Sequence, residues 1–306
     1  MIKFNGFLKT MKKKFFLLIF AALFFTASIF AQPMPPRSIH QSLEQTLIMA
    51  TGTGPDNSGF LAYLALPLKQ ETGIHLKWTS VASGQALDLG RQCQADILLV
   101  NSPAAEQPFM QQKFGMVSYP LMFDDFVIVG PSSDPAGLRG TTPIRAFQLI
   151  KFKLRYFVSR DDDSGTYTKE KELWNEARLI VPRRPNWYYR SYQGMMATLI
   201  MANQLNAYTL TDRATFLKFK EKNPYSSLQI LSQDPASLQN IYHLIIVNPS
   251  LCPNIHLSTA KMFVTWITSS EGQTLIKNYK INGQLAFTPD AQPVIFPRQK
   301  NKLYGK

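Results

Sequence analysis

The sequence lacks the residue patterns that most often mark catalytic and metal sites. Its 306 residues include four histidines and two cysteines, with no His-x-x-x-His or Cys-x-x-Cys spacing of the kind that holds zinc. It also lacks the Gly-x-Ser-x-Gly pattern of hydrolases and the Gly-Lys-Ser/Thr end of a phosphate-binding loop. We therefore expect no enzyme, no catalytic residue, no cofactor and no site for a free metal ion.

Acidic residues are also scarce. The chain has 20 Asp and Glu against 33 Lys and Arg, and its net charge is +13. The first 31 residues hold five lysines and no acid, so the remainder carries about +8. Basic proteins often bind nucleic acid, but we expect the aromatic and basic segment 183–192 to pack on the fold instead. The positive charge is more consistent with a protein that attracts a small anion. The alternative is that the charge serves only solubility.

The first 31 residues have the composition of a secretory signal peptide. A cluster of lysines precedes the apolar run 15–25, and small residues at 27–31 offer a cleavage site. The run is short for a membrane span, so we expect cleavage and a periplasmic protein, with a retained anchor as the alternative. Residues 32–43 would form a flexible lead-in. In that compartment Cys93 and Cys252 could pair, or they could be separate buried thiols.

Strands and helices alternate along much of the chain. Strand-like apolar segments at 46–51, 74–81 and 95–100 each run into a short polar turn and a helix. This alternation predicts an α/β fold with a parallel sheet covered on both faces. Ligands of such sheets bind at the carboxyl ends of the strands, where Thr51 and Ser83 fall.

A segment rich in Pro and Gly at 132–142 interrupts this alternation and suggests a crossing between two lobes. A later strand at 240–247 would return the chain to the first lobe. We therefore expect a first lobe made of residues 44–124 and 241–306, and a second lobe made of residues 125–240.

The stretch 159–166 offers the strongest site chemistry. It lies between a strand-like segment and a predicted helix that reaches residue 177. Ser164 and Thr166 would place hydroxyl and backbone N–H groups at the positive end of that helix, and Arg160 adds a cation with planar donors. These groups predict a small-anion site, and a plain helix cap beside a solvated Arg160 is the alternative. The three aspartates at 161–163 would also suit magnesium, but the neighbouring arginine argues against a cation.

Eight short motifs follow one another along the chain. They are Ala50-Thr51 through Ser58-Gly59, Ser83-Gly84-Gln85-Ala86-Leu87, Ala95-Asp96-Ile97-Leu98-Leu99-Val100, Pro103-Ala104-Ala105-Glu106, Asp125-Phe126-Val127-Ile128-Val129-Gly130-Pro131, Ser159-Arg160 with Asp162-Asp163-Ser164-Gly165-Thr166, Gly194-Met195 with Ala197-Thr198-Leu199, and Tyr208-Thr209-Leu210-Thr211-Asp212-Arg213. In this order and spacing they resemble the TupA-like tungstate-binding proteins of ABC importers, over residues 45–290.

The resemblance implies a two-lobe periplasmic binding protein of the type II-like kind. Each lobe would hold a mostly parallel sheet flanked by helices, and two crossing segments would join the lobes. The implied oxyanion-binding residues are Thr51, Thr53, Ser83, Arg160, Ser164 and Thr166. A deprotonated dianion only accepts hydrogen bonds, so residues 161–163 would have to point away from it, capping the helix or bracing Arg160.

The implied function is the capture of tungstate, or molybdate, for a membrane permease with a separate ATPase. Such a protein would be a monomer, would meet the membrane only through the permease, would bind no nucleic acid, and would hold the metal only as its oxyanion. Several residues depart from the family pattern: Gly52 and Gly54 remove hydroxyls, Asp161 replaces a glycine, and Asn101 stands where His is common. The alternatives are a protein that binds sulfate or phosphate, and an anion sensor without a transport role.

Overall fold

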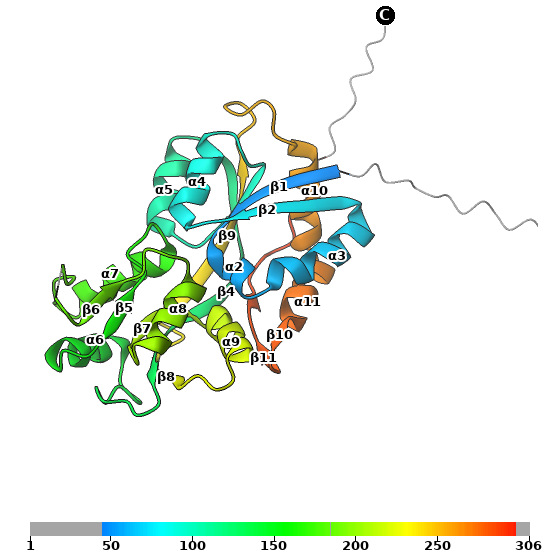
Figure 1. Ribbon diagram of the computed structural model, residues 1–306. Helices are drawn as coiled ribbons and strands as arrows, with labels where there is room; N and C mark the ends of the chain where they lie inside the picture. The colour runs from blue at the N-terminus through cyan, green and yellow to red at the C-terminus, as the bar shows by residue number, and fades with distance from the viewer. Residues whose placement is uncertain (1–44, 184, 298–306) are drawn as a thin grey trace, which may run out of the picture. The chain divides into compact units, whose positions relative to one another are not determined.

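The computed structural model describes residues 45–183 and 185–297. The predicted signal peptide at 1–31 and the lead-in at 32–43 lie outside the described residues. The described chain forms ten helices and twelve strands (Figure 1). None of these helices is long and apolar enough to cross a membrane.

One eight-stranded sheet organises the fold (Figure 1). Six strands follow the order β12-β4-β9-β3-β1-β2, while β7 and β8 each pair with β4. The strands are β1 (Gln45–Thr51), β2 (Ile74–Ser80), β3 (Ile97–Val100), β4 (Gly115–Pro131), β7 (Thr209–Asp212), β8 (Leu228–Gln233), β9 (Gln239–Val247) and β12 (Thr288–Pro289). β1 is parallel to β2 and β3, whereas β9 is antiparallel to β3 and β4.

The α/β fold class is confirmed, but the sheet is mixed where we expected it to be mostly parallel. β4 is antiparallel to β7, β8, β9 and β12. The alternation of apolar and polar residues identifies a strand and its buried face, but it does not give the direction of the neighbouring strand. That direction depends on how distant parts of the chain return to the sheet.

β4 belongs to two parts of the sheet at once. Its residues 115–125 pair with β9, and its residues 126–131 pair with β7 and β8. The change of partner lies beside the boundary at 124/125 that the sequence suggests between two lobes.

Helices cover this sheet. They are α2 (Thr53–Asn57), α3 (Phe60–Thr72), α4 (Ser83–Arg91), α5 (Pro103–Gln111), α6 (Pro143–Phe152), α7 (Gly165–Glu176), α8 (Met195–Gln204), α9 (Arg213–Lys222), α10 (Leu257–Ile267) and α11 (Ser270–Asn278). Two short strand pairs complete the described chain: β5 (Phe157–Ser159) with β6 (Tyr188–Arg190), and β10 (Lys280–Ile281) with β11 (Gln284–Leu285).

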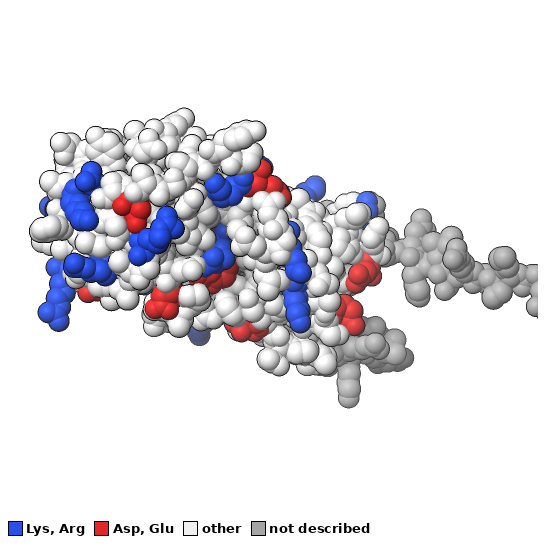
Figure 2. Space-filling view, turned by 90° about the horizontal axis from the view of Figure 1, so that it is seen from below, with Lys and Arg blue, Asp and Glu red and all other residues white. Residues whose placement is uncertain are grey.

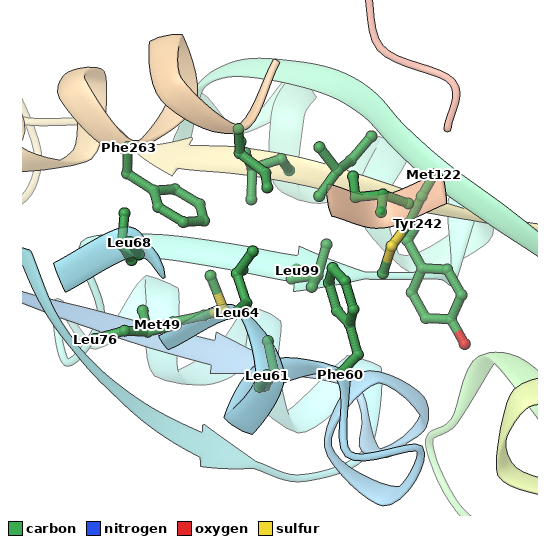
Figure 3. Close-up of a cluster of buried hydrophobic side chains, with 14 of the residues drawn as sticks. Met49, Phe60, Leu61, Leu64, Leu68, Leu76, Leu99, Met122, Tyr242 and Phe263 are labelled. Atoms are coloured by element: carbon green, nitrogen blue, oxygen red, sulfur yellow. The ribbon is translucent and has the colours of Figure 1, made fainter. Parts of the chain in front are cut away.

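Buried apolar side chains form separate clusters on the two parts of the sheet. In the first core region, Phe60 and Leu64 of α3 face Phe263 of α10 and Tyr242 of β9 (Figure 3). α3 contributes apolar side chains at helical spacing, so one face of the helix is buried in this cluster.

The second core region draws its buried residues from positions 126–238. Phe147 of α6 packs edge-on against Trp174 of α7, with 4.6 Å between the ring centroids, and also contacts Phe157 of β5. Trp187 and Tyr188 are buried in the same cluster. The prediction that the aromatic and basic segment packs on the fold is therefore confirmed for these two rings.

A disulfide joins Cys93 to Cys252, with 5.3 Å between the two Cα atoms. It links the end of α4 to the turn that follows β9. Of the two alternatives that the sequence left open for these cysteines, pairing is the one observed. The bond spans 159 residues of sequence, and cross-links of long loops restrict the unfolded chain most strongly in the entropic model.

Candidate functional site

Several helices begin at the same place in the described fold. At the start of α4, the Gly84 N–H donates to the Asp163 carbonyl oxygen, 3.0 Å away and just before α7. Gly165, the first residue of α7, lies so close to the Asn101 carbonyl oxygen that a Cβ atom there would overlap with it. Gly194, which precedes α8, lies beside the Thr53 side chain. The sequence predicted the helix starts individually, and the structure brings them together.

The place where these helices begin favours a negatively charged ligand. The first N–H groups of a helix lack partners within that helix, and the macrodipole makes this end positive. Ser164 caps α7 by accepting a hydrogen bond from the Tyr167 N–H at 3.1 Å. The side chains of Ala82 and Gly194, the described residues before α4 and α8, form no cap, although Gln85 Oε1 accepts a hydrogen bond from the Ala82 N–H at 3.4 Å. An anion is the natural partner of such grouped donors.

Arg160 adds a buried cation to these donors. Its side chain is 4% exposed. Nη1 donates to Thr53 Oγ1 at 3.1 Å, while Nε and Nη2 donate to one oxygen of Asp162 at 3.1 and 2.6 Å. A guanidinium has five N–H donors, so the hydrogen bonds found in the described chain use three of them. Two donors are left for a ligand.

Asp161 and Asp162, two of the three aspartates after Arg160, take different roles. Asp162 braces the guanidinium and accepts a hydrogen bond from the Ser164 N–H at 3.2 Å, so the bracing role expected for this stretch is observed. Asp161 lies in a left-handed conformation, with a φ of 47°, and forms an ion pair with Arg190 at 2.9 Å. Asp162 is also among the residues that line the groove described next, and the expectation that residues 161–163 point away from the anion stays a prediction.

A groove of about 480 Å³ opens beside Arg160. Thr53 and Arg160 are the two predicted site residues among those that line it, together with Asp162, Gln85 and Gly194. The other four predicted residues do not line this groove and are buried in the protein. These are Thr51, Ser83, Ser164 and Thr166, each at most 4% exposed.

Thr51, one of the predicted anion-binding residues, forms its hydrogen bonds within the protein. Its Oγ1 donates to backbone carbonyl oxygens, with Leu99 at 3.0 Å and Gly52 at 3.1 Å. The single hydroxyl hydrogen is therefore used within the protein. Gly52 lies between Thr51 and the rest of the site, and a Cβ atom there would approach the Ser83 hydroxyl to 3.0 Å.

A chain of polar side chains runs from Ser83 to β4. The Ser83 hydroxyl donates to Asn101 Oδ1 at 2.7 Å, Asn101 Nδ2 donates to Asn240 Oδ1 at 2.8 Å, and Asn240 Nδ2 donates to Asp124 Oδ1 at 2.7 Å. Asn240 and Asp124 were not predicted to take part. They belong to β9 and β4, which pair across 116 residues of sequence, so no local pattern could have found them. The sequence singled out Asn101 only as a departure from the family pattern, although it directly follows β3 at the edge that carries Thr51.

Two buried carboxyl groups lie near the end of this chain. Burial raises the pKa of Asp124 well above its usual range, and the charge of Asp212 raises it further. Burial also raises the pKa of Asp212, against its hydrogen bonds to Thr215 and the charge of Arg160. The raised pKa values favour the protonated forms of Asp124 and Asp212, which lie near the point where β4 changes its pairing partner.

Glu170 supports the loop that carries Arg160. One oxygen of its buried carboxylate accepts from Ser159 Oγ at 2.7 Å, and the other accepts from Tyr188 OH at 2.6 Å and Trp174 Nε1 at 3.0 Å. Ser159 Oγ in turn accepts from the Asp161 N–H. Burial raises the pKa of Glu170 to about 7, although these three hydrogen bonds act to lower it.

Comparison with known proteins identifies the family of the chain. A family model described as PBP superfamily domain matches residues 40–271, which is more than half of the chain. The tungstate-binding protein TupA of Campylobacter jejuni is 37% identical over 238 residues, which cover 78% of this chain and 88% of that protein. The chain belongs to the TupA-like family of the PBP superfamily.

Solved structures support the same conclusion. The tungstate-binding protein TupA of Desulfovibrio alaskensis has a TM-score of 0.70 and 41% identity, over 81% of this chain and 100% of that chain. The tungstate ABC transporter structure from Geobacter sulfurreducens has a TM-score of 0.70 and 37% identity, over 77% and 99% of the two chains. The resemblance given by the eight motifs is confirmed.

Proposed function

We propose that this protein is the extracytoplasmic solute-binding protein of an ABC transporter and that it captures tungstate or molybdate. The observation that carries the proposal is the meeting of Arg160 with the helix starts of α4, α7 and α8. Together they supply charge and N–H donors at one buried place. A deprotonated tetrahedral dianion accepts hydrogen bonds on all its oxygens, so a donor-rich site suits it.

The proposed ligand set is Thr53, Ser83, Arg160, Ser164 and Thr166, with Thr51 supporting the first loop. Ser83 would turn its hydroxyl from Asn101 to the anion when the anion binds. Ser164 accepts the Tyr167 N–H through its oxygen, so its own hydrogen can be donated to a ligand. In place of the hydroxyls lost at Gly52 and Gly54, the backbone N–H groups of Thr53 and Gly54 would donate, because the Gly52 N–H already donates to the Leu99 carbonyl oxygen at 3.0 Å.

Capture would take place between two lobes, residues 44–124 with 241–306 and residues 125–240. One buried cluster draws all its residues from 126–238, within the second lobe, and supports this division, although Ala214 and Leu217 of α9 pack into the cluster of the first lobe. Arg160, which belongs to the proposed second lobe, donates a hydrogen bond to Thr53 of the proposed first lobe. A candidate site residue therefore already links the two lobes. Closure of the lobes would remove the anion from water and strengthen each hydrogen bond to it.

The proposed route is secretion with a cleaved signal peptide, capture in the periplasm and delivery to a permease with a separate ATPase. The protein would act as a monomer and would catalyse no reaction. The relatives' names support the route, because they describe tungstate binding and an ABC transporter.

Calorimetric titration of the purified protein with tungstate, molybdate, sulfate and phosphate tests the proposal. Tungstate or molybdate should bind at least a hundredfold more tightly than sulfate and phosphate. Tight phosphate binding with no response to tungstate would overturn it.

A phosphate- or sulfate-binding protein is the second candidate, and Asp162 is the observation that favours phosphate. A carboxylate in the groove can accept a hydrogen bond from a protonated anion such as hydrogen phosphate, but it repels a full dianion.

An anion sensor without a transport role would show the same binding. The absence of permease and ATPase genes near the gene for this protein would favour the sensor.

A further inference from the structure

Two segments of the second core region carry only positive charge. Residues 135–159 contain five Lys and Arg and no Asp or Glu, and residues 177–187 contain three Arg and no acid. The segments lie side by side, because Gln148 of α6 donates to the Ala177 carbonyl oxygen at 3.4 Å. Figure 2 shows Lys and Arg gathered on the left, the side on which Figure 1 draws α6 and β6, with few acidic side chains among them.

Large, exposed apolar side chains lie close to these basic residues. A groove of about 570 Å³ lies between α6 and residues 177–179, and Arg145, Lys151, Phe152 and Leu179 line it. Phe152 is 85% exposed and Ile180, next to Leu179, is 87% exposed. We call this the α6 surface, and its members are Arg145, Lys151, Phe152, Arg178, Leu179 and Ile180.

We propose that the α6 surface binds a lipid bilayer that contains anionic phospholipids. Arginine and lysine side chains attract anionic headgroups, and exposed Phe and Ile side chains can enter the boundary between headgroups and acyl chains. The core of a protein interface is usually depleted of charge, whereas here Lys151 and Lys153 flank Phe152, and Arg178 lies two residues before Ile180. This mixture matches a charged lipid surface better than a protein face.

The α6 surface is separate from the candidate anion site. None of its six residues lines the groove beside Arg160. The Lys151 ammonium lies over the Trp187 ring at 5.1 Å from its centroid, so this cation is held in place at the surface. Membrane binding is therefore independent of the proposed transport function, and tungstate should not affect it. This proposal departs from the expectation that the protein meets the membrane only through the permease.

Sedimentation of the purified protein with lipid vesicles tests this proposal. We expect binding to vesicles of phosphatidylcholine mixed with phosphatidylglycerol, little binding to phosphatidylcholine alone, and a steep loss of binding as salt is raised. Phe152→Ser combined with Ile180→Ser should lower the partition coefficient about tenfold or more. Arg145→Gln combined with Arg178→Gln should lower it by a similar factor and flatten the salt dependence.

Tyr225→Ser is the matched control. Tyr225 is also fully exposed and lies between α9 and β8, outside the α6 surface, so its replacement should leave partitioning unchanged. Thermal unfolding checks that every variant folds. Three outcomes overturn the proposal: no binding to the anionic vesicles, equal binding to neutral ones, or binding that both double variants retain. The last outcome would assign the attachment to another part of the chain.

Discussion

The Arg160 guanidinium donates to Thr53 Oγ1 at 3.1 Å, across 107 residues of sequence. Arg160 follows β5 in the second core region, and Thr53 begins α2 beside the first. A residue at the candidate anion site therefore also joins the two parts of the chain. Loss of the Arg160 side chain should therefore weaken anion binding far more than loss of an arginine elsewhere in the chain.

Arg160→Ala should weaken tungstate binding by about 2 to 5 kcal/mol, because it leaves a desolvated dianion without its cation. Arg160→Lys keeps the charge but loses the planar donors, so it should recover only part of the loss. Calorimetry measures both effects. Arg183→Ala removes an exposed arginine and serves as the control, since it should cost little. Equal affinities for the Arg160 and Arg183 alanine variants would show that the site is elsewhere.

Asp162→Asn should change the choice between anions. The carboxylate disfavours a full dianion and can accept the proton of hydrogen phosphate, so its removal should raise the preference for tungstate over phosphate about tenfold, or ~1.4 kcal/mol. Both affinities should also fall somewhat, because Asp162 braces Arg160. Competition titrations at constant pH give the ratio. A ratio that does not move would mean that this carboxylate does not face the ligand.

Glu170 predicts a pH dependence of stability. Its pKa is raised from 4.5 to about 7 on folding, so between these values the folded chain binds a proton more tightly than the unfolded chain. The contribution of Glu170 to stability should therefore fall as pH rises through this window, by at most ~3 kcal/mol.

Urea unfolding of the wild type and of Glu170→Gln, from pH 5 to pH 8, measures this contribution. The glutamine keeps the shape of the side chain but does not titrate. The stability of the wild type relative to the variant should decline with rising pH. Parallel curves would contradict the predicted shift.

Removal of the disulfide should lower stability without abolishing anion binding. Cys93→Ser with Cys252→Ser should reduce the free energy of unfolding by about 2 to 5 kcal/mol, because the unfolded chain regains the freedom of a long loop. The bond lies at the far end of α4 from Ser83, so the binding site should keep its geometry. Urea unfolding measures the loss, and the wild type in reducing agent is the control. An unchanged midpoint would show that the cross-link does not restrict the unfolded chain.

The sequence indicated the elements whose signal is local. Apolar spacing in α3 and the strand-like run of β1 identified the first core region, and the polar turns before α4 and α7 identified helix starts. The hydrogen-bond pattern between these turns is set by tertiary contacts instead. The Thr51 hydroxyl turns to Leu99 because β1 and β3 are neighbours, and Asn240 reaches Asp124 because β9 returns beside β4.

The Cys93–Cys252 bond closes a covalent ring in the polypeptide that contains the whole of the second core region. A protease that cuts a single exposed turn between these cysteines would open the ring but would not release either fragment. The nicked protein would migrate as one species until its sulfurs were reduced.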